Sequence, residues 1–285
     1  MPDRTAPRAS TRLRSLLARE DRVLAVLGTP NAFHAQIMEA AGCEAAFVGI
    51  GITGGNYTAF PDTGVLSAAE CVQFGGYIAR AVSFPVILDG DTGHGGAPDV
   101  RRLVHECIRA GLAGIRIDDQ PIEGKRATQT PGIEVVSRDA AVERYRAAVR
   151  ARDDLDPDFV IMAQCYARDA VNGGMPELVE RLDAYWKLGG VDWVQFESPH
   201  SIDEIRQARA AVSGTLSVMQ GKLARPLTLA EHFALGLRIA WYTFLPDQVL
   251  KATSWKFLCD FKERDIDAWT NFQATHEGNP YLRTR

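Results

Sequence analysis

The chain alternates short apolar runs with longer amphipathic segments about eight times along its 285 residues. The apolar runs carry few charges, as expected for strands of a parallel sheet that is covered on both faces. We therefore expect strands at residues 23–27, 45–50, 85–89, 113–117, 159–163, 191–196, 215–219 and 237–241. Segments with helical spacing lie between them, at residues 32–41, 67–81, 98–110, 137–151, 177–188, 202–212 and 227–235.

Several of these helical segments carry start and stop signals. Ser67 and Glu70 have the spacing of a capping box, and Gly42 and Gly111 follow the expected ends of two helices. About eight strand–helix units without a linker predict an α/β fold in one domain, residues 1–285, most simply a (β/α)8 TIM barrel. A doubly wound open sheet is the alternative, but the first strand lacks the G-x-G-x-x-G turn of that fold.

The C-terminal part of the chain, from about residue 246 to 285, reads as a helical extension of this domain. Its long helix, residues 246–264, carries an apolar stripe that includes Trp255, Phe257, Leu258 and Phe261. A barrel needs one helix after its last strand. The stripe therefore predicts either packing against a neighbouring subunit or folding back on the same barrel.

Composition excludes several classes of protein. The net charge of -4 and the lack of a basic stripe argue against a nucleic acid or a membrane surface as partner. The five cysteines are scattered without a CxxC pair, the polar N-terminus lacks an apolar signal region, and no apolar run is long enough to span a bilayer. We therefore expect a cytoplasmic protein with reduced thiols.

The segment Asp89-Gly-Asp91-Thr-Gly-His94-Gly-Gly follows the third expected strand and carries the strongest sign of function. Two carboxylates one residue apart project to the same side of an extended chain, and the glycines let a ligand approach the backbone. Hard oxygen ligands suit Mg²⁺ or Mn²⁺, which would polarise a carbonyl or stabilise an enolate. The alternative is an acidic turn that caps the next helix.

A second acidic pair, Asp118 and Asp119, ends the fourth expected strand. Beside Asp89 and Asp91 it would complete a cluster of four carboxylates. Such a cluster is unfavourable without a cation, because each carboxylate raises the pKa of the others. The second pair therefore favours a metal site over a capping turn.

Polar residues follow the other strands too, as an active site at the C-terminal ends of barrel strands requires. They are Gln164, Tyr166, Glu197 and Gln220. Lys125 and Arg126 lie on a loop, residues 124–132, that could close over an anion or simply carry solvated charges. The glycine-rich segment 50–55 could offer backbone amides to a carboxylate or be a flexible connection, and Asp62 lies in a Pro-Asp turn.

These motifs resemble the isocitrate lyase/phosphoenolpyruvate mutase superfamily, in a divergent subgroup similar to methylisocitrate lyase and carboxyphosphonoenolpyruvate phosphonomutase. The resemblance runs in order from about residue 12 to about residue 270. It rests on residues 60–64, 85–95, 113–120 followed by 125–126, 159–163 and 228–236. H-E-x-x-H, G-x-S-x-G and P-loop motifs are absent, which excludes zincins, α/β-hydrolases and P-loop nucleoside triphosphatases.

The resemblance implies a modified barrel, often a homotetramer, whose C-terminal helix is exchanged between subunits. It implies Mg²⁺ (or Mn²⁺), a small 2-oxo or 2-hydroxy carboxylic acid as substrate, and an enolate-type intermediate on the metal. The implied metal site is Asp89 and Asp91, with Asp118 bonding through water. The other residues implied are Lys125, Arg126, Asp62 and Glu197 for catalysis, and Phe47, Gly49, Ile50, Gly51, His94, Gln164, Tyr166 and Gln220 for substrate binding.

The catalytic loop departs from the family pattern. That loop usually reads K-[KR]-C-G-H, with the cysteine as acid or base, but here Lys125 and Arg126 are followed by Ala127-Thr128-Gln129. Because no thiol is present, a proton would have to come from water, Tyr166, His94 or Lys125.

The expected substrate pocket departs as well. Gly49 replaces a serine, Gln164 replaces an arginine that clamps a carboxylate, and Gln220 replaces an asparagine. A charge-assisted hydrogen bond contributes ~1.5–3 kcal/mol, so a small dicarboxylate should bind poorly unless Tyr166, Arg168 or Lys222 compensates.

Three functions follow as hypotheses. The first is a Mg²⁺-dependent carbon–carbon lyase acting on a substituted 2-hydroxy or 2-oxo acid. The second is a phosphonate mutase or hydrolase, or an oxaloacetate-type decarboxylase or hydrolase. The third is a barrel without catalysis that binds a ligand, which the retained acidic cluster argues against.

Overall fold

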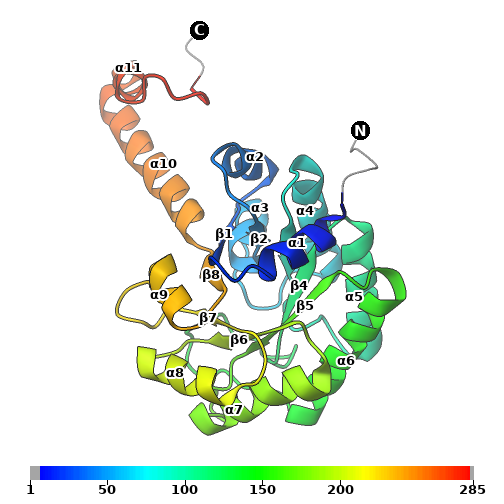
Figure 1. Cartoon of the computed structure of the whole chain (residues 1–285). Helices are drawn as coiled ribbons and strands as arrows, with labels where there is room; N and C mark the ends of the chain where they lie inside the picture. The colour runs from blue at the N-terminus through cyan, green and yellow to red at the C-terminus, as the bar shows by residue number, and fades with distance from the viewer. Residues whose placement is uncertain (1–6, 283–285) are drawn as a thin grey trace. The chain divides into compact units, whose positions relative to one another are not determined.

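The computed structural model describes residues 7–282 of the chain. Its eight strands are β1 (Leu24–Gly28), β2 (Ala46–Val48), β3 (Val86–Asp89), β4 (Gly114–Asp118), β5 (Val160–Cys165), β6 (Trp193–Glu197), β7 (Leu216–Met219) and β8 (Ile239–Tyr242). All paired strands are parallel, in the order β7-β6-β5-β4-β3-β2-β1-β8, and they curve into a nearly closed barrel (Figure 1). The predicted (β/α)8 barrel is confirmed.

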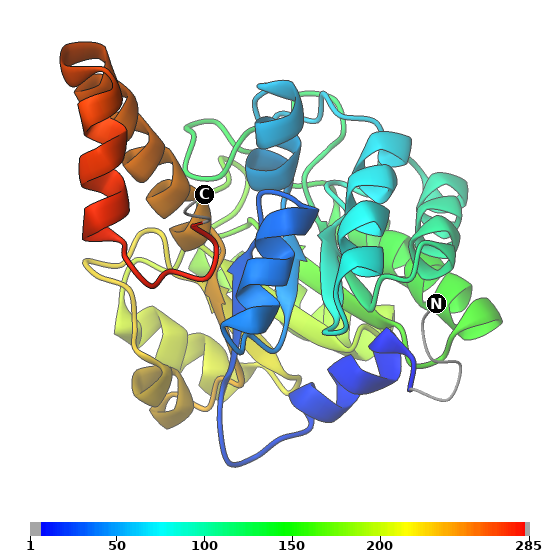
Figure 2. The ribbon, with the colours of Figure 1, turned by 90° about the horizontal axis from the view of Figure 1, so that it is seen from above.

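Helices surround this sheet (Figure 2). They are α1 (Ala9–Leu17), α2 (Ala32–Ala40), α3 (Gly55–Thr58), α4 (Ala68–Ala81), α5 (Ala97–Arg109), α6 (Arg138–Leu155), α7 (Met175–Ala184), α8 (Ile202–Ala211) and α9 (Leu229–Ala234), with π-helical turns η1 (Ile50–Gly54) and η2 (Tyr185–Gly189). The capping box expected at Ser67 is formed, since its side chain accepts from the Glu70 amide and the Glu70 carboxylate accepts from the Ser67 amide.

The core has two parts. Residues on the outer face of the strands pack under the helices, and those on the inner face fill the barrel. Leu13 of α1 belongs to the inner cluster, together with Val26 and Val160. Helix α1, which the sequence reading did not predict, therefore adds an apolar residue to the barrel interior.

The segment after β2 differs from the prediction. The strand ends at Val48, and residues 50–58 form η1 and α3 rather than a glycine-rich connection. The Gly49 carbonyl accepts hydrogen bonds from the amides of Thr53 and Gly54, and the Thr53 hydroxyl donates to the Thr29 carbonyl. The amides of Thr53 and Gly54 therefore already donate hydrogen bonds within the turn and are not free to bind a substrate carboxylate.

Within the described chain, residues 244–282 form a second compact unit. Within it, α10 (Leu245–Arg264) and α11 (Ile266–Thr275) pack through aromatic rings, with Phe257 and Phe272 centred 5.4 Å apart. Trp255 and Leu258 of the apolar stripe are exposed in the chain by itself. Exchange of this helix between subunits stays a prediction. No helix of the described chain combines the length and apolarity that a bilayer crossing needs.

Candidate active site at the C-terminal ends of the strands

Most residues expected to form a site lie at the C-terminal ends of neighbouring strands. Asp89 ends β3, Asp118 ends β4 and Glu197 ends β6, while Gln164 lies in β5 opposite Asp118 in the ladder. All four side chains are buried. Parallel pairing of β3 to β6 therefore brings polar groups from four separate segments to one end of the barrel.

Lys125 links the loop 124–132 to the acidic residues. Its ammonium group lies 2.6 Å from Asp62 Oδ1 and 2.7 Å from Asp91 Oδ1, and the side chain is almost fully buried. The loop is also tied to β4, because the Gln120 side chain accepts from the Arg126 amide and donates to the Arg126 carbonyl. Arg126 itself is exposed.

Arg116 is a site residue that the sequence reading missed. Its guanidinium bonds Asp89 Oδ2 at 2.9 Å and Gln195 Oε1 at 3.2 Å, and stacks 4.4 Å above the ring of Phe47. Both members of the Arg116–Asp89 pair are buried. The available signal was an arginine within the otherwise apolar run 113–117, where a buried charge requires a partner.

The turn after β3 has an unusual backbone. Asp91 has φ 53° and His94 has φ 58°, a left-handed conformation that costs free energy for residues other than glycine. Asp89 Oδ1 accepts from the Asp91 amide, and Asp91 Oδ1 accepts from the Thr92 amide. Asp91 Oδ2 is buried without a hydrogen-bond partner. A carboxylate oxygen is thus held ready for a cation or a donor.

Burial shifts several pKa values in this cluster. Burial raises the pKa of Asp118 to about 8, although Lys125 opposes the shift. Burial likewise raises the pKa of Asp62 and of Glu197. Burial lowers the pKa of Lys125, but the carboxylates of Asp62, Asp118 and Asp91 raise it by more. The site therefore holds more acidic groups than its two basic partners neutralise.

The donor set fits a divalent cation in type and charge. Asp89, Asp91 and Asp118 offer hard oxygen ligands, and the unpartnered Asp91 oxygen marks where positive charge is missing. As the side chains stand, no group of three acidic, histidine or cysteine side chains in residues 7–282 is arranged around one metal position. Lys125 and Arg116 instead pair with Asp91 and Asp89, so a metal would share these carboxylates with both cations.

Asp119 lies outside the cluster, and the expected group of four carboxylates at two strand ends is wrong in this respect. Its Oδ1 accepts from the Tyr166 amide and its Oδ2 from the Tyr185 hydroxyl, with Arg181 at 3.5 Å. Adjacent strand residues point to opposite faces, so Asp119 faces the helices while Asp118 faces the site. Asp62 is the fourth carboxylate of the cluster instead, because Lys125 pairs with both Asp62 and Asp91.

Glu197 is the centre of a second set of contacts. Its Oε1 accepts from Thr128 Oγ1 at 2.6 Å and from Ser198 Oγ at 3.2 Å, and its Oε2 accepts from Gln164 Nε2 at 2.6 Å. The Tyr166 hydroxyl lies 3.4 Å from the same Gln164 nitrogen. Loop 124–132 therefore contacts β6 as well as β3 and β4.

The other predicted substrate-binding residues have varied surroundings. Gly51 lies against Asp62, whereas Gly49 and Ile50 begin the η1 turn. The Gln220 amide donates to the Trp241 carbonyl and accepts from the Leu227 amide. His94 lines a cavity between α4 and α5 together with Ser67, Val72, Gln73, Asp99 and Leu103.

The two basic residues suggested as replacements for the missing arginine are already paired. Arg168 bonds Glu204 at 2.7 Å, and Lys222 bonds Asp169 at 2.7 Å. His200 also contacts Asp169, at 2.7 Å. These pairs give Arg168 and Lys222 acidic partners within the protein and reduce what they could offer a substrate carboxylate.

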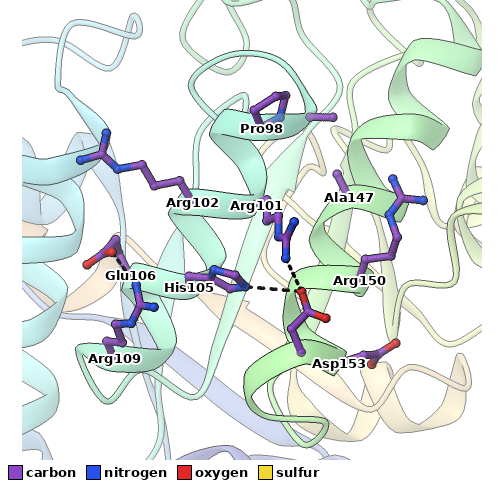
Figure 3. Close-up of a pocket in the computed structure, with 11 residues that line it drawn as sticks. Pro98, Arg101, Arg102, His105, Glu106, Arg109, Ala147, Arg150 and Asp153 are labelled. Carbon is purple, nitrogen blue, oxygen red and sulfur yellow. Dashed lines mark hydrogen bonds and ion pairs between the residues drawn. The ribbon is translucent and has the colours of Figure 1, made fainter.

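A large surface groove lies elsewhere on the barrel. A groove of about 840 Å³ runs between α5 and α6 on the outside of the barrel, lined by arginine and acidic side chains (Figure 3). Asp154 pairs with Arg101 at 2.8 Å and lies 3.9 Å from His105. The groove between α5 and α6 carries charges of both signs. It contains none of the strand-end residues, so we do not assign the reaction to this groove.

Known proteins are similar to this chain over most of its length. The family model of phosphoenolpyruvate phosphomutase matches residues 13–254. A 2,3-dimethylmalate lyase of Eubacterium barkeri is 35% identical over 236 residues, which cover 82% of this chain and 79% of the relative.

Two solved structures have the same fold. Oxaloacetate acetylhydrolase in complex with 3,3-difluorooxalacetate superposes with a TM-score of 0.83 at 26% identity over 94% of each chain. Phosphonopyruvate hydrolase in complex with oxalate and Mg²⁺ superposes with a TM-score of 0.78 at 26% identity, over 97% of this chain and 100% of the other. The chain belongs to the phosphoenolpyruvate mutase/isocitrate lyase superfamily.

Proposed function

We propose that this protein is a carbon–carbon lyase that cleaves a substituted 2-hydroxy or 2-oxo carboxylic acid with the help of Mg²⁺ or Mn²⁺. Its superfamily includes lyases, mutases and hydrolases by name, and the relative at 35% identity is a dimethylmalate lyase. The observation that carries the proposal is the buried acidic cluster at the ends of β3 and β4, with one carboxylate oxygen of Asp91 left without a partner.

Asp89, Asp91 and Asp118 would hold the metal. When bound, such an ion supplies electrostatic stabilisation of negative charge on an oxygen of the reacting acid. Lys125 offsets the charge of Asp62 and Asp91 and fixes the base of loop 124–132 over the site. That placement of the loop would limit the access of water to a carbanionic product.

The substrate is proposed to have a bulky or weakly charged end. Gln164 replaces the arginine expected to clamp a second carboxylate, and its amide is bonded to Glu197. Arg168 and Lys222 are engaged by Glu204 and Asp169. These contacts favour a substituted acid over a small, highly charged one. Phe47, Gly49, Ile50, Gly51, His94, Tyr166 and Gln220 stay candidates for substrate contacts, as does Arg126 for catalysis.

The test is a screen of 2-hydroxy, 2-oxo and phosphono acids with the purified protein, in Mg²⁺ or Mn²⁺ and in EDTA, read by mass spectrometry. We expect release of an oxo acid that stops in EDTA. Phosphate released from phosphonopyruvate, followed by ³¹P NMR, would instead favour the hydrolase. Turnover that persists in EDTA would contradict the metal-dependent proposal.

Isothermal titration with Mg²⁺ and Mn²⁺ tests the metal site separately. We expect Asp91→Asn to weaken binding at least tenfold, while Asp203→Asn, at an exposed position on α8, leaves it unchanged. A wild-type protein that binds neither ion and turns over no acid would favour the barrel without catalysis. We also propose a cytoplasmic homotetramer, by analogy with the family pattern.

A further inference from the structure

Loop 124–132 lacks the thiol that serves as acid or base in the lyase pattern. The four alternative proton donors named from the sequence are water, Tyr166, His94 and Lys125, and they are not equally suited to give up a proton. Lys125 is held by two carboxylates. Burial raises the pKa of Tyr166 well above its usual value, which makes its hydroxyl a poor acid. His94 lines the cavity between α4 and α5. Water is left, together with groups that the sequence did not single out.

Thr128 is such a group, and it contacts Glu197, which the family resemblance already implies for catalysis. Thr128 is on the loop, one residue beyond Ala127, which stands where the pattern has its cysteine. Its hydroxyl lies 2.6 Å from Glu197 Oε1, at the end of β6. Glu197 is buried, with 3% of the residue exposed. A loop hydroxyl near the usual thiol position is thus connected to a buried carboxyl.

The partners of Glu197 are neutral. Thr128, Ser198 and Gln164 supply its hydrogen bonds, and in the described part of the chain it forms no ion pair. The charged and titratable groups that face it are Arg116 from β4 and Tyr166, which directly follows β5. Burial raises the pKa of Glu197, and the hydrogen bonds and Arg116 lower it by less. A carboxyl in such surroundings holds its proton at a higher pH than an exposed one does.

We propose that Thr128 is the catalytic proton donor to the carbon released by bond cleavage, and that Glu197 supplies the proton through the Thr128 hydroxyl. This inference rests on the proposed lyase function. The electron pair of the broken carbon–carbon bond stays on the leaving fragment, whose carbon takes the hydrogen of Thr128 Oγ1. When Glu197 is protonated, its Oε1–H donates to Thr128 Oγ1 across the same 2.6 Å contact, which leaves the Thr128 hydrogen free for the carbon. The Thr128 oxygen then takes the proton of Glu197 Oε1, and Glu197 becomes a carboxylate. The hydroxyl of the other fragment loses its proton to solvent and becomes a carbonyl, and solvent then returns one proton to Glu197.

The variants Thr128→Val and Thr128→Ser separate the hydroxyl from the shape of the side chain. With a substrate that the wild type cleaves, we expect Thr128→Val to lower kcat by about 10²–10⁴-fold with little change in KM. Thr128→Ser keeps the hydroxyl and should stay within about tenfold of the wild type. Thr130→Val, the same change at an exposed position of the same loop, is the matched control. A Thr128→Val enzyme with wild-type kcat would overturn the proposal.

A pH profile tests the role of Glu197. The reaction needs the protonated carboxyl, so the kcat of the wild type should fall as pH rises through the raised pKa of Glu197. Glu197→Gln should have a lower kcat without that fall. If the high-pH fall persists unchanged in Glu197→Gln, Glu197 is not the proton source.

Infrared spectroscopy separates failure of this inference from failure of the proposed function. If the wild type cleaves no acid in the screen, the lyase proposal fails. The difference spectrum between wild type and Glu197→Gln, recorded with Mg²⁺ near neutral pH, still reports on the pair. A protonated carboxyl band in the wild type supports a held proton on Glu197, and its absence at all pH values above the ordinary range of a glutamate contradicts it.

Discussion

Neighbouring residues of this site have opposite roles. Asp118 faces the acidic cluster, whereas Asp119 bonds Tyr185 and the Tyr166 amide on the helical side. The sequence predicted Asp118 and Asp119 in one cluster because they are adjacent at the end of one expected strand. Successive side chains of a strand point to opposite faces, however, and this alternation separates the two carboxylates. The role of Arg116 was not predicted. A sequence pattern can place this arginine on a strand, but it does not show which distant carboxylate the side chain contacts.

Arg116 gives a prediction at this scale. In metal-free protein, Arg116→Met should lower the free energy of unfolding by about 3–5 kcal/mol, because Asp89 would stay buried without its partner. Added Mg²⁺ should restore part of the loss, so its stabilising effect should be greater in the variant than in the wild type. Chemical denaturation with and without Mg²⁺ measures both effects.

Arg101→Met provides the comparison, since the Arg101–Asp154 pair is exposed and should contribute at most ~1 kcal/mol. Equal decreases in the free energy of unfolding would show that the buried Arg116–Asp89 pair contributes no more to stability than the exposed pair does.

Loop 124–132 is the element on which the site depends. Lys125 attaches it to Asp62 and Asp91, Gln120 attaches it to the end of β4, and Thr128 attaches it to Glu197. The sequence predicted a loop that could close over an anion. In the structure its lysine contacts carboxylates of the protein, and closure over a substrate stays a prediction.

Removing the lysine should loosen the loop. Lys125→Ala takes away one buried ion pair, with Asp91, and one partly buried pair, with Asp62. Amide hydrogen exchange within residues 124–132 should therefore become faster and protease cleavage there more frequent. Lys187→Ala, which removes an exposed pair with Asp183 on the barrel's outer surface, should leave the loop unchanged. A loop equally protected in the Lys125→Ala variant would mean that its other contacts suffice.

At the scale of the molecule, the fold was predictable and the contacts across the barrel were not. Eight apolar runs separated by helical patterns require a covered parallel sheet, and every expected strand is present within a few residues. The pairings of Lys125 and Arg116 depend on where β3, β4 and two loops meet. The partners in these pairs lie 63 residues apart for Lys125 and Asp62 and 27 residues apart for Arg116 and Asp89, so no local sequence pattern predicts the pairs.

The exposed stripe on α10 gives a prediction about assembly. Trp255 is 72% exposed in the chain by itself, and Leu258 is exposed beside it. If α10 packs against another subunit, the double substitution Trp255→Ser with Leu258→Ser should reduce the mass measured by light scattering during gel filtration from a tetramer towards a monomer. Lys256→Ser on the same helix should not. A monomeric wild type would contradict the expected assembly.

The order of strands places β7 and β8 at the two ends of the sheet, and the ladders of the described chain do not join them. Two side-chain contacts connect this flank instead: the Gln220 side chain, just after β7, donates to the Trp241 carbonyl of β8, and the Tyr242 hydroxyl of β8 donates to the Leu227 carbonyl. Two side-chain contacts give way more readily than a row of backbone bonds. Thermal fluctuations that widen the barrel should therefore start on this flank, where Gln220 and Tyr242 supply the side-chain contacts across the gap.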